Sequence, residues 1–239
     1  MLHVVARTTV GAICVAGLIG VSADAVRYPA TTFTIAQIRY GTDRWNPHPT
    51  ALQSLLTEVA NRTSIETGAP VALTLADPQL FDYPFLYIAG RDSQAPWRSA
   101  DCRRLTDHLF GGGFLLVDPT SILFRESILS NLAQCLPSLT LQPIAKADVF
   151  LRSFYLIDGI TTLRGIGQEG RLIVVVSDDD LGRAWAKDHL GQWLYPDVGS
   201  EDRSRAFQIG VNAVLAALTL DYKLDQTHVE YLLKRRRGL

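Results

Sequence analysis

The stretch "HLFGGGFLLVDP", residues 108–119, decides how the order of elements in this chain is read. Apolar residues at helical spacing precede its glycines, and an apolar run typical of a buried strand follows them and ends at Asp118. A dinucleotide-binding loop requires the order strand, glycines, helix, because the phosphate binds the free N–H groups of a helix N-terminus. Gly111 instead predicts the end of a helix, where glycine readily adopts left-handed dihedrals. The glycines therefore predict a turn between a helix and a strand.

Outward from this stretch, the chain alternates between segments typical of strands and segments typical of helices. Short apolar runs bounded by Gly or Pro suit strands that are buried on both faces, and apolar residues at i, i+3, i+4 spacing predict helices. The expected strands are residues 33–41, 71–75, 85–90, 114–118 and 171–180, and the expected helices are residues 50–62, about 99–110, 122–135 and 202–220. Single helices between strands imply right-handed crossovers and a three-layer, doubly wound α/β fold with a mostly parallel sheet.

The composition is that of one well-packed globular domain. The 239 residues are 47% hydrophobic and 20% charged, with a formal net charge of -1. The body of the chain has no basic run that would predict nucleic-acid binding.

The first residues have the pattern of a secretory signal peptide. Arg7 precedes an apolar stretch over residues 8–22, and Ala23-Asp24-Ala25 supplies the small-x-small pattern of a cleavage site. We therefore expect a signal peptide over residues 1–25, cleavage after Ala25, and a periplasmic protein. A permanent inner-membrane anchor is the alternative, although the stretch is shorter than the roughly 20 apolar residues that span a bilayer comfortably.

The expected mature chain is one α/β domain over residues 26–222, followed by a basic tail or helix over residues 223–239. A solvated tail is the favoured interpretation, because runs of charge commonly stay exposed. The alternative is contact with anionic lipid through the basic cluster Lys234, Arg235, Arg236 and Arg237.

Cleavage would leave two cysteines, Cys102 and Cys135, in an oxidising compartment. Two buried thiols are the favoured interpretation, because free cysteine is commonly buried. A disulfide between them is the alternative, and the sequence does not decide the pairing.

Ligands of open α/β sheets bind outside the carboxyl ends of the strands, so the residues that follow each strand are the candidates for a site. The ligand-binding candidates are Tyr40, Arg44, Trp45, Asp118, Asp178 and Asp179. The alternative for the aspartates, including Asp180, is that they cap the following helices, which is the preferred interpretation there. Trp45 and Arg44 could equally form a loop over the sheet edge with the cation on the indole.

Catalytic and metal-binding motifs do not occur in the sequence. No G-x-S-x-G elbow or analogous cysteine elbow is present, and the histidines lack H-x-H or H-E-x-x-H spacing. We therefore expect no catalytic residues, no metal and no cofactor.

Six segments together resemble a family known as Domain of Unknown Function 4159. They are "IRYG", "DPQLFDYPFLYIAG", "LFGGGFLLVD", "RSFYLID", "GRLIVVVSDDDLGRAW" and "AFQIGVNAVLAAL". The resemblance implies a bacterial, exported or membrane-associated protein with a flavodoxin-like fold related to class I glutamine amidotransferases, and no established activity. Asp148-Val149 stands where many relatives have His-Pro, and the elbow cysteine of the amidotransferases is missing. The resemblance therefore predicts the fold but not the catalytic activity of the amidotransferases.

The leading functional hypothesis is a non-catalytic periplasmic module of the cell envelope that binds a small polar ligand or a protein partner. Its crevice would be built from Tyr40, Arg44, Trp45, Asp118 and Asp178. The alternative is a hydrolase or amidase-like enzyme that uses carboxylates such as Asp118 and Asp178 as acid and base. A third hypothesis is attachment to an envelope complex through another surface.

Overall fold

The computed structural model describes residues 32–41, 44–158 and 162–237, with side chains up to residue 218. Thr32–Leu239 form one compact unit. The expected signal peptide and its cleavage site after Ala25 lie outside the described residues. No helix in the described part of the chain combines the length and apolar character that a bilayer span requires.

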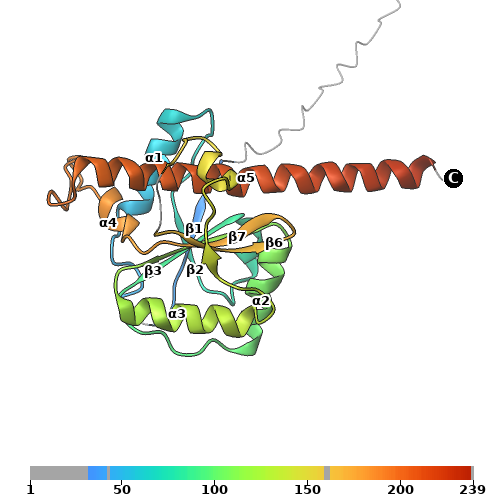
Figure 1. The fold of residues 1–239 in the computed structure, drawn as a ribbon, viewed down its shortest axis with the longest axis horizontal. Helices are drawn as coiled ribbons and strands as arrows, with labels where there is room; N and C mark the ends of the chain where they lie inside the picture. Colours follow the sequence, from blue (N-terminus) through green and yellow to red (C-terminus); the bar gives the residue numbers. More distant parts are fainter. Residues whose placement is uncertain (1–31, 42–43, 159–161, 238–239) are drawn as a thin grey trace, which may run out of the picture. The chain divides into compact units, whose positions relative to one another are not determined.

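A seven-stranded sheet forms the centre of the fold (Figure 1). Its order is β2-β1-β3-β4-β7-β6-β5, and the first five strands in this order are parallel. The strands are β1 (Ile35–Ile38), β2 (Val71–Leu73), β3 (Phe85–Gly90), β4 (Phe114–Pro119), β5 (Gln142–Pro143), β6 (Arg164–Gln168) and β7 (Arg171–Val176). The parallel strands have the order of a doubly wound sheet. From β1 the chain adds β2 on one side, and it then adds β3, β4 and β7 on the other side, so the strand order reverses beside β1.

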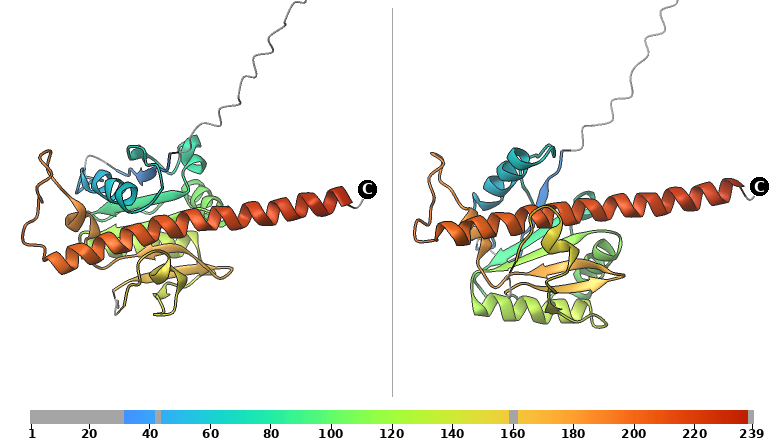
Figure 2. Two further views of the ribbon diagram at one scale, coloured as in Figure 1. Left: turned by 90° about the horizontal axis from the view of Figure 1, so that it is seen from above. Right: turned by 45° about the horizontal axis from the view of Figure 1, so that its top comes forward.

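Helices cover both faces of the sheet and complete the predicted three layers. One face carries α1 (Ala51–Arg62), α4 (Leu181–Trp185) and α5 (Ser200–Arg237), and the other carries α2 (Ser99–Phe110) and α3 (Ile122–Cys135) (Figures 1 and 2). Two 3₁₀ helices, η1 (Pro78–Asp82) and η2 (Val149–Arg152), lie in the connections. Alternate residues of β3 enter different cores, since Phe85 and Tyr87 face α1, α4 and α5, whereas Leu86 faces α2 and α3.

The glycine turn has the structure that the sequence predicts. Helix α2 ends at Phe110, and β4 begins at Phe114. The left-handed residue is Gly112, with φ +115°, and not Gly111, whose φ is −74°. A Cβ on Gly113 would lie 1.9 Å from the His108 ring, so the turn also needs a glycine for space.

Helix α2 begins at Ser99, where the sequence predicts its start, with Arg98 at the N-cap position. Other expected boundaries were wrong. The last helix continues to Arg237, beyond the predicted end at residue 220. Strands β5 and β6 were not predicted, and both are antiparallel to their neighbours. Glu169 and Gly170 both have positive φ between β6 and β7, as a two-residue hairpin turn requires.

The favoured interpretation of the two cysteines as thiols was wrong, because Cys102 and Cys135 form a disulfide. Helices α2 and α3 cover the same face of the sheet, and their packing brings the two Cα atoms to 4.8 Å. Thr106 donates a hydrogen bond to the carbonyl of Cys135 at 3.1 Å, which joins the same two helices beside the bridge. Only the tertiary packing of the helices sets this pairing.

Candidate functional site

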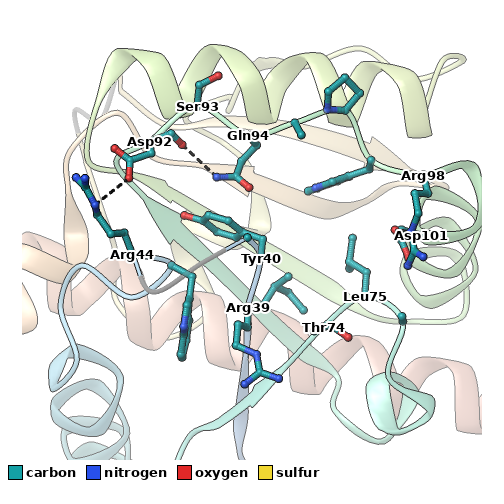
Figure 3. A pocket seen from close by; sticks show the side chains of 17 residues that line it. Arg39, Tyr40, Arg44, Thr74, Leu75, Asp92, Ser93, Gln94, Arg98 and Asp101 are labelled. Carbon is teal, nitrogen blue, oxygen red and sulfur yellow. Dashed lines mark hydrogen bonds and ion pairs between the residues drawn. The ribbon is translucent and has the colours of Figure 1, made fainter.

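An open hollow lies at the carboxyl ends of β1, β2 and β3, where the strand order reverses (Figure 3). Its volume is about 610 Å³, within the usual range of roughly 300–1,000 Å³ for small-molecule sites. Three segments line it: residues 38–41, 44 and 45 after β1, residues 74–76 after β2, and the loop from Asp92 to Arg98 between β3 and α2, with Asp101. The predicted site residues Tyr40, Arg44 and Trp45 are among the lining residues.

Tyr40 occupies a fixed position in this hollow. Its hydroxyl donates a hydrogen bond to the Ala89 carbonyl at 2.6 Å, and its ring packs on Phe124 with centroids 5.5 Å apart. A Cβ on Gly90 would lie 1.6 Å from that hydroxyl, so a glycine at the end of β3 is required for this contact. Burial, with a smaller effect of Asp92, raises the pKa of Tyr40 well above its usual value. At ordinary pH the Tyr40 hydroxyl therefore stays protonated, and the side chain forms a preorganised wall of the hollow.

Helix α3 holds the loop of residues 91–98 from behind. Asn131, which is buried, accepts a hydrogen bond from Trp97 N–H at 3.0 Å and donates one to the Ala95 carbonyl at 3.2 Å. Ser127 Oγ accepts a further bond from Gln94 N–H at 2.8 Å. Because side chains of α3 hydrogen-bond the backbone of this loop, the loop has a defined shape where it lines the hollow.

The wall after β2 is held in a similar way. Arg104 on α2 donates hydrogen bonds to the carbonyls of Leu75, at 2.9 Å, and Asp77. The Asp77 carboxylate accepts bonds from the backbone and hydroxyl of Thr74, at 2.9 and 3.1 Å, and these bonds lower its pKa. The hollow is therefore bounded by ordered backbone on two sides.

The charged residues of the hollow include both signs. Arg44 pairs with Asp92 at 3.5 Å, and Arg98 pairs with Asp101 at 2.7 Å, at opposite ends of the hollow (Figure 3). Arg39 is exposed, and its guanidinium makes no hydrogen bond or ion pair with any residue that the structure describes. With three arginines and two aspartates, the described lining has a net charge of +1. No cation lies over the Trp45 ring within the described ranges, so the predicted contact with Arg44 is not formed.

Sequence comparison places the chain in a known family. A family profile matches residues 34–218, more than half of the chain. The chain belongs to the family DUF4159, a domain of unknown function. This confirms the family resemblance of the six sequence segments. No curated protein shows significant similarity to this DUF4159 protein.

A second polar cluster of the DUF4159 domain lies on the other face of the sheet and centres on Asp118. This carboxylate is fully buried and accepts three hydrogen bonds, from Tyr87 hydroxyl at 2.6 Å and from the N–H groups of Leu181 and Gly182 at 2.7 Å each. Burial and the neighbouring charge of Asp180 raise its pKa to about 7, against the opposing effect of the three donors. Asp118 therefore binds the N-terminus of α4, which follows the neighbouring strand β7.

His48 and Asp180 extend this buried cluster. His48 Nε2 lies 2.8 Å from Asp180 Oδ1, and its Nδ1 lies 3.1 Å from the Tyr195 hydroxyl. Asp180 also accepts a bond from Arg183 N–H at 3.2 Å and caps α4, as predicted. Both His48 nitrogens are engaged, so the cluster is a structural network that joins α4 to the loops before α1 and α5.

The remaining predicted aspartates lie apart from the hollow. Asp178 pairs with Arg125 at 3.0 Å and with Arg164 at 3.3 Å. Asp179 accepts a bond from the Thr162 hydroxyl at 2.8 Å. The structure therefore does not bring Tyr40, Asp118 and Asp178 into one crevice, since Tyr40, Arg44 and Trp45 are the predicted site residues that line the hollow.

The alternation of side chains along a strand explains this division. Tyr40 packs with the core under α2 and α3, whereas Asp118 reaches Tyr87 and α4 on the opposite face. Sequence reasoning also missed Arg39 and Trp97 as lining residues and Asn131 as their support. Arg39 directly follows β1 and could have been found by the rule that was applied to Tyr40.

Within the described residues, no group of three or more His, Cys, Asp or Glu side chains could hold a metal ion. The hollow beside β1 in the DUF4159 domain is thus of ligand size and has preorganised walls, whereas Asp118, Asp178 and Asp179 are engaged in hydrogen bonds or ion pairs outside it.

Proposed function

We propose that this DUF4159 protein is an exported, non-catalytic module of the cell envelope that binds a small polar ligand in the hollow beside β1. The observation that carries the proposal is the open hollow of about 610 Å³ at the point where the strand order reverses. Ligands of doubly wound sheets bind at this position, because loops from both directions meet there without covering it.

Export is supported by two independent features. The N-terminal sequence has the pattern of a signal peptide, with small residues at positions 23 and 25. The disulfide between Cys102 and Cys135 is of a kind that persists in oxidising compartments and is rare in the cytosol. The periplasm is therefore the proposed location.

A hydrolase is less well supported by the geometry. Such an enzyme requires at least two carboxylates that converge with a third polar group in a pocket. Asp118 is fully buried and already accepts three hydrogen bonds, while Asp178 lies outside the hollow and is paired with Arg125 on α3 and Arg164 on β6. We infer that the chain shares its fold with class I glutamine amidotransferases, as the family resemblance implies, without their nucleophile.

Native mass spectrometry of the protein from its own envelope tests the proposal. We expect a bound small molecule on the wild type, loss of that molecule from Trp45→Ala, and retention by Phe110→Ala. Both positions carry an accessible aromatic ring, but Trp45 lines the hollow and Phe110 is exposed at the end of α2.

Two results would overturn the proposal. One is a ligand that Trp45→Ala retains as fully as the wild type, which would place its site elsewhere. The other is a preparation that hydrolyses model esters or amides and loses this activity in Asp178→Asn. The second result would establish the carboxylate enzyme in place of the binding module.

A further inference from the structure

We propose that the ligand of the hollow is a sugar that carries a carboxylate. The inference rests on the proposed function, because it names the chemistry of the ligand that the hollow would hold. Three features of the lining carry it: indole surface, donors and acceptors side by side, and Arg39, whose guanidinium makes no hydrogen bond or ion pair with the described residues.

The aromatic surface suits a ring with one apolar face. Trp45 comes from the segment after β1 and Trp97 from the loop after β3, and both are half-buried. The negative face of an indole attracts the weakly positive C–H groups on one side of a pyranose ring. Because the Trp97 backbone is held by Asn131, its position is set before a ligand arrives.

The polar lining suits hydroxyl groups better than phosphate. Asp92 and Asp101 supply acceptors, and Arg44 and Gln94 supply donors. Sugar hydroxyls both donate and accept, so they can use both kinds of group. A phosphate presents mostly acceptor oxygens, and the N-terminus of α2, which would attract it, already contains Asp101 in its first turn.

The charge of the lining suits one carboxylate. Arg44 and Arg98 are already paired with aspartates, whereas Arg39 makes no such pair with the described residues. A guanidinium binds a carboxylate through two parallel N–H···O bonds.

Calorimetry with matched pairs of sugars tests the inference on the protein freed of any bound ligand. The pairs are N-acetylmuramic acid with N-acetylglucosamine, and galacturonic acid with galactose; inorganic phosphate and acetate serve as anion controls. We expect at least tenfold tighter binding of one acidic sugar than of its neutral counterpart, and at least tenfold tighter binding than of either anion.

Variants test which residue binds the carboxylate and which binds the sugar ring. Arg39→Gln should reduce the difference between the acidic and neutral sugars to less than twofold, because it removes the carboxylate partner. Trp45→Ala should weaken both sugars about tenfold. Arg103→Gln, an exposed arginine of α2 outside the hollow, should change neither.

The inference is overturned if the acidic sugars bind no better than the neutral sugars, or if Arg39→Gln leaves the difference intact. Tighter binding of phosphate than of the acidic sugars would also overturn it. If these sugars do not bind but an envelope ligand is retained in a Trp45-dependent way, the inference fails and the proposed function stands. If neither binds, both fail.

Discussion

Removal of the Cys102–Cys135 disulfide should destabilise the protein by a predictable amount. The bridge closes a loop with a sequence separation of 33 residues. Loop closure of this length lowers the entropy of the unfolded chain, which corresponds to about 3.7 kcal/mol at 25 °C. We expect the double variant Cys102→Ala/Cys135→Ala to lose roughly 3–4 kcal/mol of unfolding free energy, and roughly 7–15 °C of Tm.

Urea unfolding of the proposed mature chain, residues 26–239, measures this loss. The wild type is compared in oxidised form, after reduction, and with the double variant. Reduction and substitution should give the same loss to within about 1 kcal/mol, because both remove the same covalent constraint. Thr106→Val serves as the control, since it removes the adjacent hydrogen bond between α2 and α3 and keeps the bridge. Its expected cost is about 1 kcal/mol.

Two outcomes would refute this reasoning. Equal stability of the oxidised and reduced forms would mean that the bridge does not constrain the unfolded chain. Two reactive thiols per folded chain, in protein isolated from an oxidising compartment, would mean that the bridge does not form. The second outcome would also remove one of the two supports for export.

Two further predictions concern buried polar groups. The pKa of Asp118 is raised to about 7, so its contribution to stability is full below the ordinary carboxyl pKa of 3.8 and is lost as the pH rises through about 7. The difference in unfolding free energy between wild type and Asp118→Asn should therefore shrink between pH 5 and pH 8, by at most about 1.4 kcal/mol per pH unit; a constant difference would contradict the pKa. Asn131→Ala should cost about 1–3 kcal/mol and speed hydrogen exchange of the Trp97 amide, because both groups bonded to Asn131 lose a partner. Gln134→Ala is its control, since Gln134 is exposed and bonds the Trp97 carbonyl at only 3.4 Å; equal exchange in the two variants would contradict the role of Asn131.

The parallel core of the fold could be predicted because its signals are local. Apolar periodicity located α1 and β3, and the glycines after α2 marked a turn whose polarity excluded a phosphate loop. Strands β5 and β6 were missed because β5 is exposed and very short, and β6 contains two glycines in place of an apolar run. Their pairing depends on β7, which lies later in the chain.

Part of the candidate site could be predicted as well. The rule that ligands bind beyond the carboxyl ends of parallel strands selected Tyr40, Arg44 and Trp45, which line the hollow. The same rule also selected Asp118, which lies on the other face of the sheet. A rule about strand ends specifies one edge of a sheet, but it does not specify on which side of that edge a side chain lies.

The sequence by itself determined the kinds of elements, their order along the chain and the common direction of the core strands, because periodicity and turn chemistry act over a few residues. Only the tertiary structure decided the order of strands across the sheet, the pairing of Cys102 with Cys135 and the separation of Tyr40 from Asp118. These features depend on contacts between residues that are distant in sequence. Such contacts form only when helices cover both faces of the sheet and each strand side chain packs into one of the two cores.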